Sequence, residues 1–152
     1  MTRLYHYTTQ DVHAPKILDS GELQPRKDGA PEHEKPLLWF SKNHVWENTA
    51  TKTLLVGGEL YSLTLEQLFN EYGCVRFSMD KMPDGLMDFK TACKYAGIPT
   101  KQRLAMERFG IEKGANPKHW YALKNPVSIE GLLMEVMTDV GVWEAVGILT
   151  RA

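Results

Sequence analysis

An alternation of side-chain types near the amino terminus places the strongest constraint on how this chain folds. Residues 4–9 read Leu-Tyr-His-Tyr-Thr-Thr, which is the pattern of a half-buried β-strand. Because alternate side chains of a strand share a face, His6 points to the same side as Leu4. If Leu4 faces the core, the imidazole enters packed surroundings and requires partners for two ring nitrogens. The pattern therefore predicts that His6 either bonds a neighbouring carbonyl or holds a ligand.

Turn residues divide the next part of the chain into further elements. A short helix is expected over 11–18 and ends at Gly21, and a charged surface loop with two prolines covers 26–36. Residues 37–41 are dense in apolar side chains and predict a central strand. A helix over 43–52 is expected to follow, and its amino-terminal amides would suit a phosphate or a carboxylate.

The remainder of the chain predicts short strands and three more helices. Thr64 and Gln67 form a capping box that opens a helix through Tyr72. The order of these elements predicts an α+β fold with a mixed, largely antiparallel sheet and inserted helices. The other expected elements are strands at 54–56, 59–63, 74–78, 119–123, 127–137 and 142–148, and helices at 84–96 and 100–113.

The helix over 100–113 has a mostly basic exterior, with Leu104, Phe109 and Ile111 as its expected core side. Nucleic-acid binding would depend on a local patch of this kind, because the net charge of the chain is only -1. A solvated helix face is the alternative reading of the same charges. The residues that would form the patch are Lys101, Arg103, Arg108, Lys113, Lys118 and Lys124.

Length and composition favour one globular domain over residues 1–152, large enough to bury a core. The two cysteines, Cys74 and Cys93, suggest neither a disulfide framework nor a zinc site, and no metal is expected. The first residues lack the apolar core of a signal peptide, and no apolar run approaches the length of a membrane span. We therefore expect a cytoplasmic protein that does not act at a membrane.

The order of motifs resembles the opening of the ADP-ribosyltransferase superfamily. A Tyr-His-Tyr-Thr strand, a helix ending in Ile-Leu-x-Ser-Gly-x-Leu-x-Pro and a Trp-Phe-Ser strand carry the resemblance. The chain is most similar to the branch whose motif is histidine, an aromatic residue and an acid, shared by diphtheria-type toxins and rifamycin-modifying enzymes. It also resembles small bacterial and phage proteins of the same length. The resemblance is strongest over 4–50 and looser from Lys118 onward, and it implies a split sheet.

The resemblance also implies how NAD would be held as the substrate. His6 matches the histidine that bonds the adenosine ribose, and Tyr7 and Thr8 would supply backbone groups to the nicotinamide amide. Phe40 or Trp39 takes the place of the aromatic residue that stacks on nicotinamide, where an aromatic face suits the cationic ring. The other implied pocket residues are Ser41, Trp46 and Ala50.

The sequence departs from the family pattern at the acid. The family places a carboxylate at the start of a late strand, but residues 118–121 read Lys-His-Trp-Tyr. A carboxylate is needed because cleavage of the nicotinamide–ribose bond develops positive charge on the sugar. Glu135 and His119 are the catalytic candidates, with the solvent face of a strand as the alternative place for Glu135. Glu47 and Glu34 are more distant substitutes.

Three functions remain open at this point. The first is NAD-dependent ADP-ribosyl transfer to a protein, a nucleic acid or a small molecule. The second is an RNA 2'-phosphotransferase-like activity, in which His6, Arg76 and His119 form a basic site. The third is a binding or inhibitor module that keeps the cleft without the chemistry. The missing acid favours the second and third functions, whereas the His6 and Trp39-Phe40-Ser41 strands favour the first.

Overall fold

The computed structural model describes residues 2–26 and 31–150, so residues 27–30 of the expected loop lie outside the described residues. For residues 53–55 the backbone alone is described. A seven-stranded sheet dominates the fold, and every pairing among its described strands is antiparallel. The α+β class and the largely antiparallel sheet are confirmed, although the described strands form none of the parallel pairings of a mixed sheet. In spatial order the strands are β11 (Val142–Ile148), β10 (Leu133–Asp139), β6 (Cys74–Met79), β1 (Leu4–Thr9), β3 (Leu38–Ser41), β8 (Trp120–Leu123) and β7 (Met87–Asp88).

The sheet is almost divided between β1 and β3. All six residues of β1 pair with β6 and all four residues of β3 pair with β8. By contrast, β1 and β3 pair only at Tyr5 and Ser41. Across the remaining gap the His6 ring bonds the Trp39 carbonyl, with 2.8 Å between Nδ1 and O. A side chain thus replaces the backbone ladder at this point, and the two halves of the sheet diverge.

Two short antiparallel pairs lie outside the large sheet, namely β2 (Glu22–Leu23) with β9 (Val127–Ser128) and β4 (Thr53–Val56) with β5 (Glu59–Ser62). The prediction of one strand over 127–137 is wrong. Gly131 has a φ of 85°, a conformation that an extended strand does not allow, and it turns the chain between β9 and β10.

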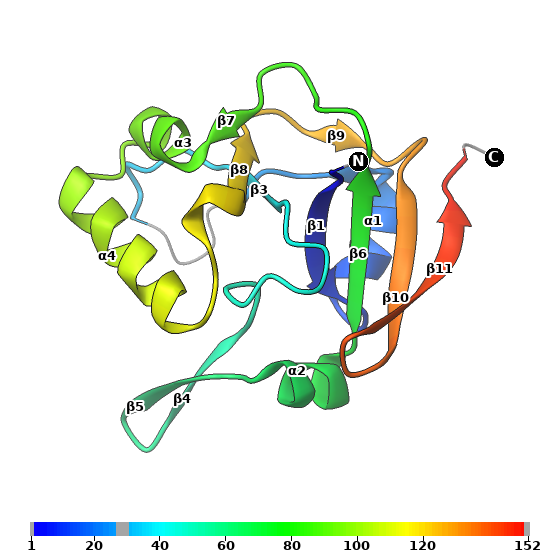
Figure 1. Cartoon of the computed structure of the whole chain (residues 1–152), viewed down its shortest axis with the longest axis horizontal. Coiled ribbons are helices and arrows are strands. Elements are labelled where there is room, and N and C mark those ends of the chain that lie inside the picture. The colour runs from blue at the N-terminus through cyan, green and yellow to red at the C-terminus, as the bar shows by residue number, and fades with distance from the viewer. Residues whose placement is uncertain (1, 27–30, 151–152) are drawn as a thin grey trace.

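Helices cover both halves of the sheet (Figure 1). The helix α1 (His13–Ser20) lies behind β1 and β6 in this view, and α2 (Leu65–Tyr72) lies below them. On the other side of the molecule, α3 (Phe89–Ala96) and α4 (Thr100–Glu112) lie beyond β8, which follows the 3-10 helix η1 (Pro117–His119). No helix among the described residues has the length and apolar character needed to span a bilayer.

The predicted helix signals are confirmed in most places. Gly21 ends α1 with a φ of 75°, and the capping box of Thr64 and Gln67 opens α2. The helix expected from residue 84 begins only at Phe89, because Asp88 accepts a hydrogen bond from the Thr91 amide and caps it there.

The prediction of a helix over 43–52 is wrong, because this segment forms turns and bends. Side chains from the sheet donate hydrogen bonds to its carbonyl groups, which in a helix would accept from the backbone amides of the same segment. Tyr7 Oη donates to the Asn43 carbonyl, Arg76 Nη1 to His44 at 2.6 Å, and Trp143 Nε1 to Val45 at 3.0 Å. The sequence alone did not reveal these partners, since they come from β1, β6 and β11. We call residues 42–52 the Glu47 loop, after the carboxylate at its centre.

Apolar residues of β1, β6 and α1 form the largest core cluster, in which Leu4, Phe77 and Ala14 are buried. The expected core side of α4 is wrong. Leu104, Phe109 and Ile111 are 42%, 50% and 59% exposed. This helix instead packs through Gly110 against Trp120.

Candidate functional site

A cavity of about 770 Å³ opens where the two halves of the sheet diverge. Its volume lies within the range of about 300–1,000 Å³ that is usual for small-molecule sites. Aromatic rings dominate its wall, with a single carboxylate, that of Glu47. The wall is built from β1, β3, the Glu47 loop, α3, α4 and β8, through Tyr5, His6, Tyr7, Trp39, Phe40, Ser41, Glu47, Thr49, Ala50, Phe89, Gln102, Ala105, Met106, Phe109 and Trp120.

The structure brings six of the eight expected NAD-binding residues to this wall: His6, Tyr7, Trp39, Phe40, Ser41 and Ala50. The two others lie elsewhere. Thr8 lines a second cavity, described below. Trp46 is 5% exposed and packs edge-on against the Tyr7 ring at a centroid distance of 4.9 Å, which places it in the core beside the site.

His6 is held in a defined protonation state and tautomer. Desolvation lowers the pKa of His6, and the nearby positive charges of Arg26 and His13 lower it further, against the opposing effect of the hydrogen bond to Trp39. The imidazole is therefore neutral at neutral pH. Because the Trp39 carbonyl can only accept, Nδ1 carries the proton and Nε2 keeps the lone pair. A neutral His6 can thus accept a hydrogen bond from a ligand hydroxyl.

Glu47 is the acid that the structure adds to the site. Its side chain is buried, and three hydrogen bonds fix its carboxylate. Ser41 Oγ donates to Oε1 at 2.8 Å, while the amide and hydroxyl of Thr49 donate to Oε2 at 3.1 Å and 2.6 Å. The carboxylate is therefore held rigidly in a mostly apolar wall, where a charge acts more strongly than in water.

Glu135, one of the two catalytic candidates, lies outside the walls of both cavities. It stands opposite Arg76 on neighbouring strands, and its Oε1 is 2.9 Å from Arg76 Nε. Arg76 is only 6% exposed, so its side chain does not lie in solvent. The guanidinium lies over the rings of Tyr5 and Trp143, at 4.4 Å and 4.3 Å from their centroids. Together these contacts tie β6 and β10 to the Glu47 loop.

His119, the other candidate, ends η1 and is also absent from the cavity walls. Its Nδ1 is buried and has no hydrogen-bond partner among the described residues. The same holds for Nε1 of Trp120, which does line the cavity. A buried indole N–H without a partner is costly, but this nitrogen is covered by protein atoms and is not open to the cavity. Of the proposed basic trio His6, Arg76 and His119, His6 alone lines either of the two cavities described here.

A second cavity of about 370 Å³ lies beside α1 and shares His6, Tyr7 and Trp39 with the first. Its chemistry differs, because it has the basic side chains of Lys16 and Arg26 in its wall. The rest of its lining comes from Thr8, His13, Ile17, Ser20, Glu22, Gln24, Leu37 and Leu38. The His6–Trp39 contact thus stands between an aromatic cavity with one acid and a second cavity lined by Lys16, Arg26 and the carboxylate of Glu22.

The wall that α4 contributes was missed by the sequence analysis. Gln102, Ala105, Met106 and Phe109 recur at helical spacing and face the cavity. The sequence analysis instead took Phe109, with Leu104 and Ile111, as the core side of this helix. The sequence analysis treated Glu47 only as a distant substitute for the family acid, because a helix over 43–52 would not have brought its carboxylate to Ser41. The spacing of a strand-end serine and a glutamate six residues later was the available signal.

Comparison of the chain with protein-family models, with curated proteins and with solved structures finds no match.

Proposed function

We propose that this protein binds NAD and transfers ADP-ribose from it, with Glu47 as the catalytic carboxylate. The observation that carries the proposal is the buried Glu47 carboxylate in an aromatic cavity at the division of the sheet. The family resemblance of the β1 and β3 motifs supports the same function, with an ADP-ribosyltransferase-like fold. In this proposal Glu47, rather than Glu135 or His119, takes the place of the missing family acid.

The chemistry suits a carboxylate in this setting. As the bond between C1' of the ribose and the nicotinamide nitrogen breaks, its electron pair leaves with nicotinamide and positive charge develops on the sugar. The fixed Glu47 carboxylate would stabilise that charge, and the acceptor would then bond to C1' and lose a proton. Rings such as Trp39 and Phe40 offer π-faces to the cationic nicotinamide ring before cleavage.

The second cavity supports the binding of a whole dinucleotide rather than nicotinamide alone. A neutral His6 with its lone pair on Nε2 suits a ribose hydroxyl at the boundary of the two cavities. Lys16 and Arg26 beyond it suit a pyrophosphate, because guanidinium and ammonium groups bind phosphate oxygens through charge-assisted hydrogen bonds. An NAD molecule with its two halves in these two environments would contact both sets of groups.

Glu47→Gln tests the proposal most directly. The glutamine keeps an oxygen for the Thr49 donors and turns its amide toward Ser41 Oγ, so the fold is expected to persist. We expect the dissociation constant of NAD, measured by tryptophan fluorescence, to stay within a few-fold of the unmutated value. The rate of nicotinamide release should fall about 10²–10³-fold, as it does when a group that stabilises developing charge is lost. Glu144→Gln, an exposed carboxylate on β11, is the matched control and should release nicotinamide at the normal rate.

Other outcomes assign the site differently. NAD binding without nicotinamide release in the unmutated protein would identify a binding module. That outcome agrees with the fact that both Glu47 oxygens already accept hydrogen bonds within the protein. Absence of NAD binding at millimolar concentration would overturn the proposal.

A further inference from the structure

The chain separates its charges along the sequence. Residues 89–124 contain eight Lys and Arg residues but only two acids, Glu107 and Glu112, which gives this segment a net charge of +6. The rest of the chain carries -7, so the total of -1 conceals a strongly basic segment. A charge of this size on about a quarter of the residues creates a local positive potential even though the whole protein is nearly neutral.

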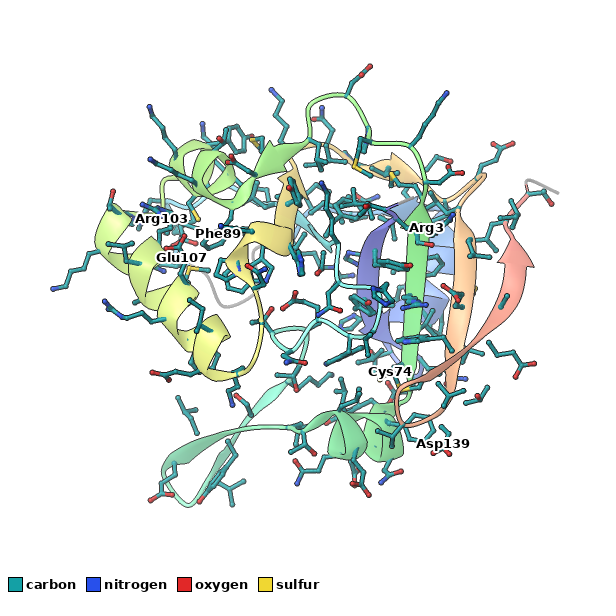
Figure 2. All side chains as sticks on the ribbon, viewed as in Figure 1. Arg3, Cys74, Phe89, Arg103, Glu107 and Asp139 are labelled. Atoms are coloured by element: carbon teal, nitrogen blue, oxygen red, sulfur yellow. The ribbon has the colours of Figure 1, made fainter. Side chains whose placement is uncertain are left out.

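The fold gathers this segment at one end of the molecule. It forms α3, α4, η1 and β8, which lie together on the side away from β10 and β11 (Figure 1). The cationic residues of the segment are exposed except Arg103, which is half-buried. Arg103 Nη1 is 3.0 Å from the Glu107 carboxylate one turn along α4 (Figure 2). The exposed cations are Lys90, Lys94, Lys101, Arg108, Lys113, Lys118 and Lys124.

The same segment forms one wall of the aromatic cavity. Phe89, Phe109 and Trp120 all line it. Phe109 is half exposed, so its ring belongs both to the cavity wall and to the outer surface, and the ammonium of Lys113 lies 5.3 Å from its centroid. The basic surface and the proposed reaction site are therefore continuous at Phe109.

The outer face of α4 alternates cations with apolar side chains. Lys101, Leu104, Arg108 and Ile111 are exposed and follow one another at spacings of three or four residues, which places them on one stripe of the helix. The cavity-facing residues Ala105, Met106 and Phe109 lie on a different side. The apolar residues thus do not form the single continuous face with which an amphipathic helix enters a membrane.

We infer that this basic end binds single-stranded nucleic acid, which is the acceptor in the proposed transfer. Phosphates would lie along the cations, and an unstacked base would find the exposed ring of Phe109 at the cavity mouth. A nucleophilic nitrogen or oxygen of that nucleotide would bond to C1' as nicotinamide leaves with the electron pair, and its proton would pass to Glu47 or to solvent. A duplex would not present such a base, because its bases are stacked and paired. This inference rests on the proposed function for the transfer step, but not for the binding step.

Binding is tested first and without NAD. Fluorescein-labelled 20-mers of thymidine and of uridine are titrated by anisotropy at 50 and 200 mM salt. We expect Lys101→Glu with Arg108→Glu to weaken binding at least tenfold and to reduce the salt slope by about 1.4, since each lost phosphate contact on a single strand removes about 0.7 from it. Lys81→Glu reverses an exposed cation outside the segment and should leave binding within twofold, whereas the single change Lys101→Glu should weaken it. Phe109→Ala should cost about tenfold with little change in the slope, as for the loss of one stacked base.

The transfer step is then followed with labelled NAD and the tighter-binding oligonucleotide. Label on the oligonucleotide, lost in Glu47→Gln, would support the acceptor assignment, and the thymidine and uridine arms decide between DNA and RNA. The inference is overturned if neither oligonucleotide binds at 50 mM salt, if the basic-end variant binds as well as its control, or if only phosphatidylserine vesicles bind. Nicotinamide release without label on the oligonucleotide overturns the acceptor assignment alone. Oligonucleotide binding without any nicotinamide release overturns the proposed function and leaves the binding surface supported.

Discussion

Gly110→Ala should destabilise the protein, although the same change usually stabilises a helix, and it therefore tests how α4 packs against the site. In the interior of a helix, replacing glycine by alanine usually stabilises by about 1 kcal/mol. At Gly110, however, an added Cβ would lie 2.4 Å and 2.5 Å from Cη2 and Cζ2 of Trp120. Carbon atoms in contact prefer about 3.5–4.0 Å, so the helix or the indole must move by about 1 Å.

The indole has little room to give way. Trp120 is 7% exposed, and Phe89 packs edge-on against it at a centroid distance of 4.8 Å. Overpacking of this kind costs about 1–3 kcal/mol, so after the helix gain we expect Gly110→Ala to lower the free energy of unfolding by about 1 kcal/mol. The measurement is urea denaturation followed by circular dichroism.

Trp120→Phe supplies the matched background, because phenylalanine lacks the outer ring atoms that Gly110 touches. In that background Gly110→Ala should stabilise by about 1 kcal/mol, which gives a coupling of about 2 kcal/mol between the two positions. Equal stabilisation by Gly110→Ala in both backgrounds would refute the packing of α4 on Trp120. The cavity wall built on that contact would then also be in doubt.

Three further outcomes follow from buried groups. Glu135→Gln should destabilise by about 3–5 kcal/mol in urea melts because it leaves the Arg76 guanidinium without its charge partner, and a loss under 1 kcal/mol would contradict this. Because burial lowers the pKa of His6, the unfolded state takes up a proton on this residue more readily than the folded state. The free energy of unfolding should therefore be full above pH 6.5 and fall as the pH drops below it. In His6→Gln the urea midpoint should change less between pH 7.5 and 5.5 than in the unmutated protein. Burial raises the pKa values of Cys74 and Cys93 to about 11, so a thiol reagent at pH 8 should label neither until urea unfolds the protein, and rapid labelling in buffer would show that one is accessible.

Local chemistry made several elements predictable. The alternation in β1 and the dense apolar run of β3 specify strands, and the capping box of Thr64 and Gln67 specifies the start of α2. These signals need no distant partner, because they depend on backbone geometry and on side chains within a few residues. For the same reason the sequence placed most residues of the aromatic wall on the correct strands before any contact was known.

The tertiary structure decided what those elements surround. The Glu47 loop is not a helix because Tyr7, Arg76 and Trp143 bind its carbonyl groups from three strands. Likewise, the apolar residues of α4 face the cavity and solvent because the helix approaches Trp120 most closely at the buried Gly110. Hydrogen bonds and packing between residues far apart in the chain depend on the final arrangement of the strands, which no local pattern encodes. Glu47 was only a distant substitute in the sequence, and the folded loop that holds its carboxylate against Ser41 and Thr49 made it part of the cavity wall.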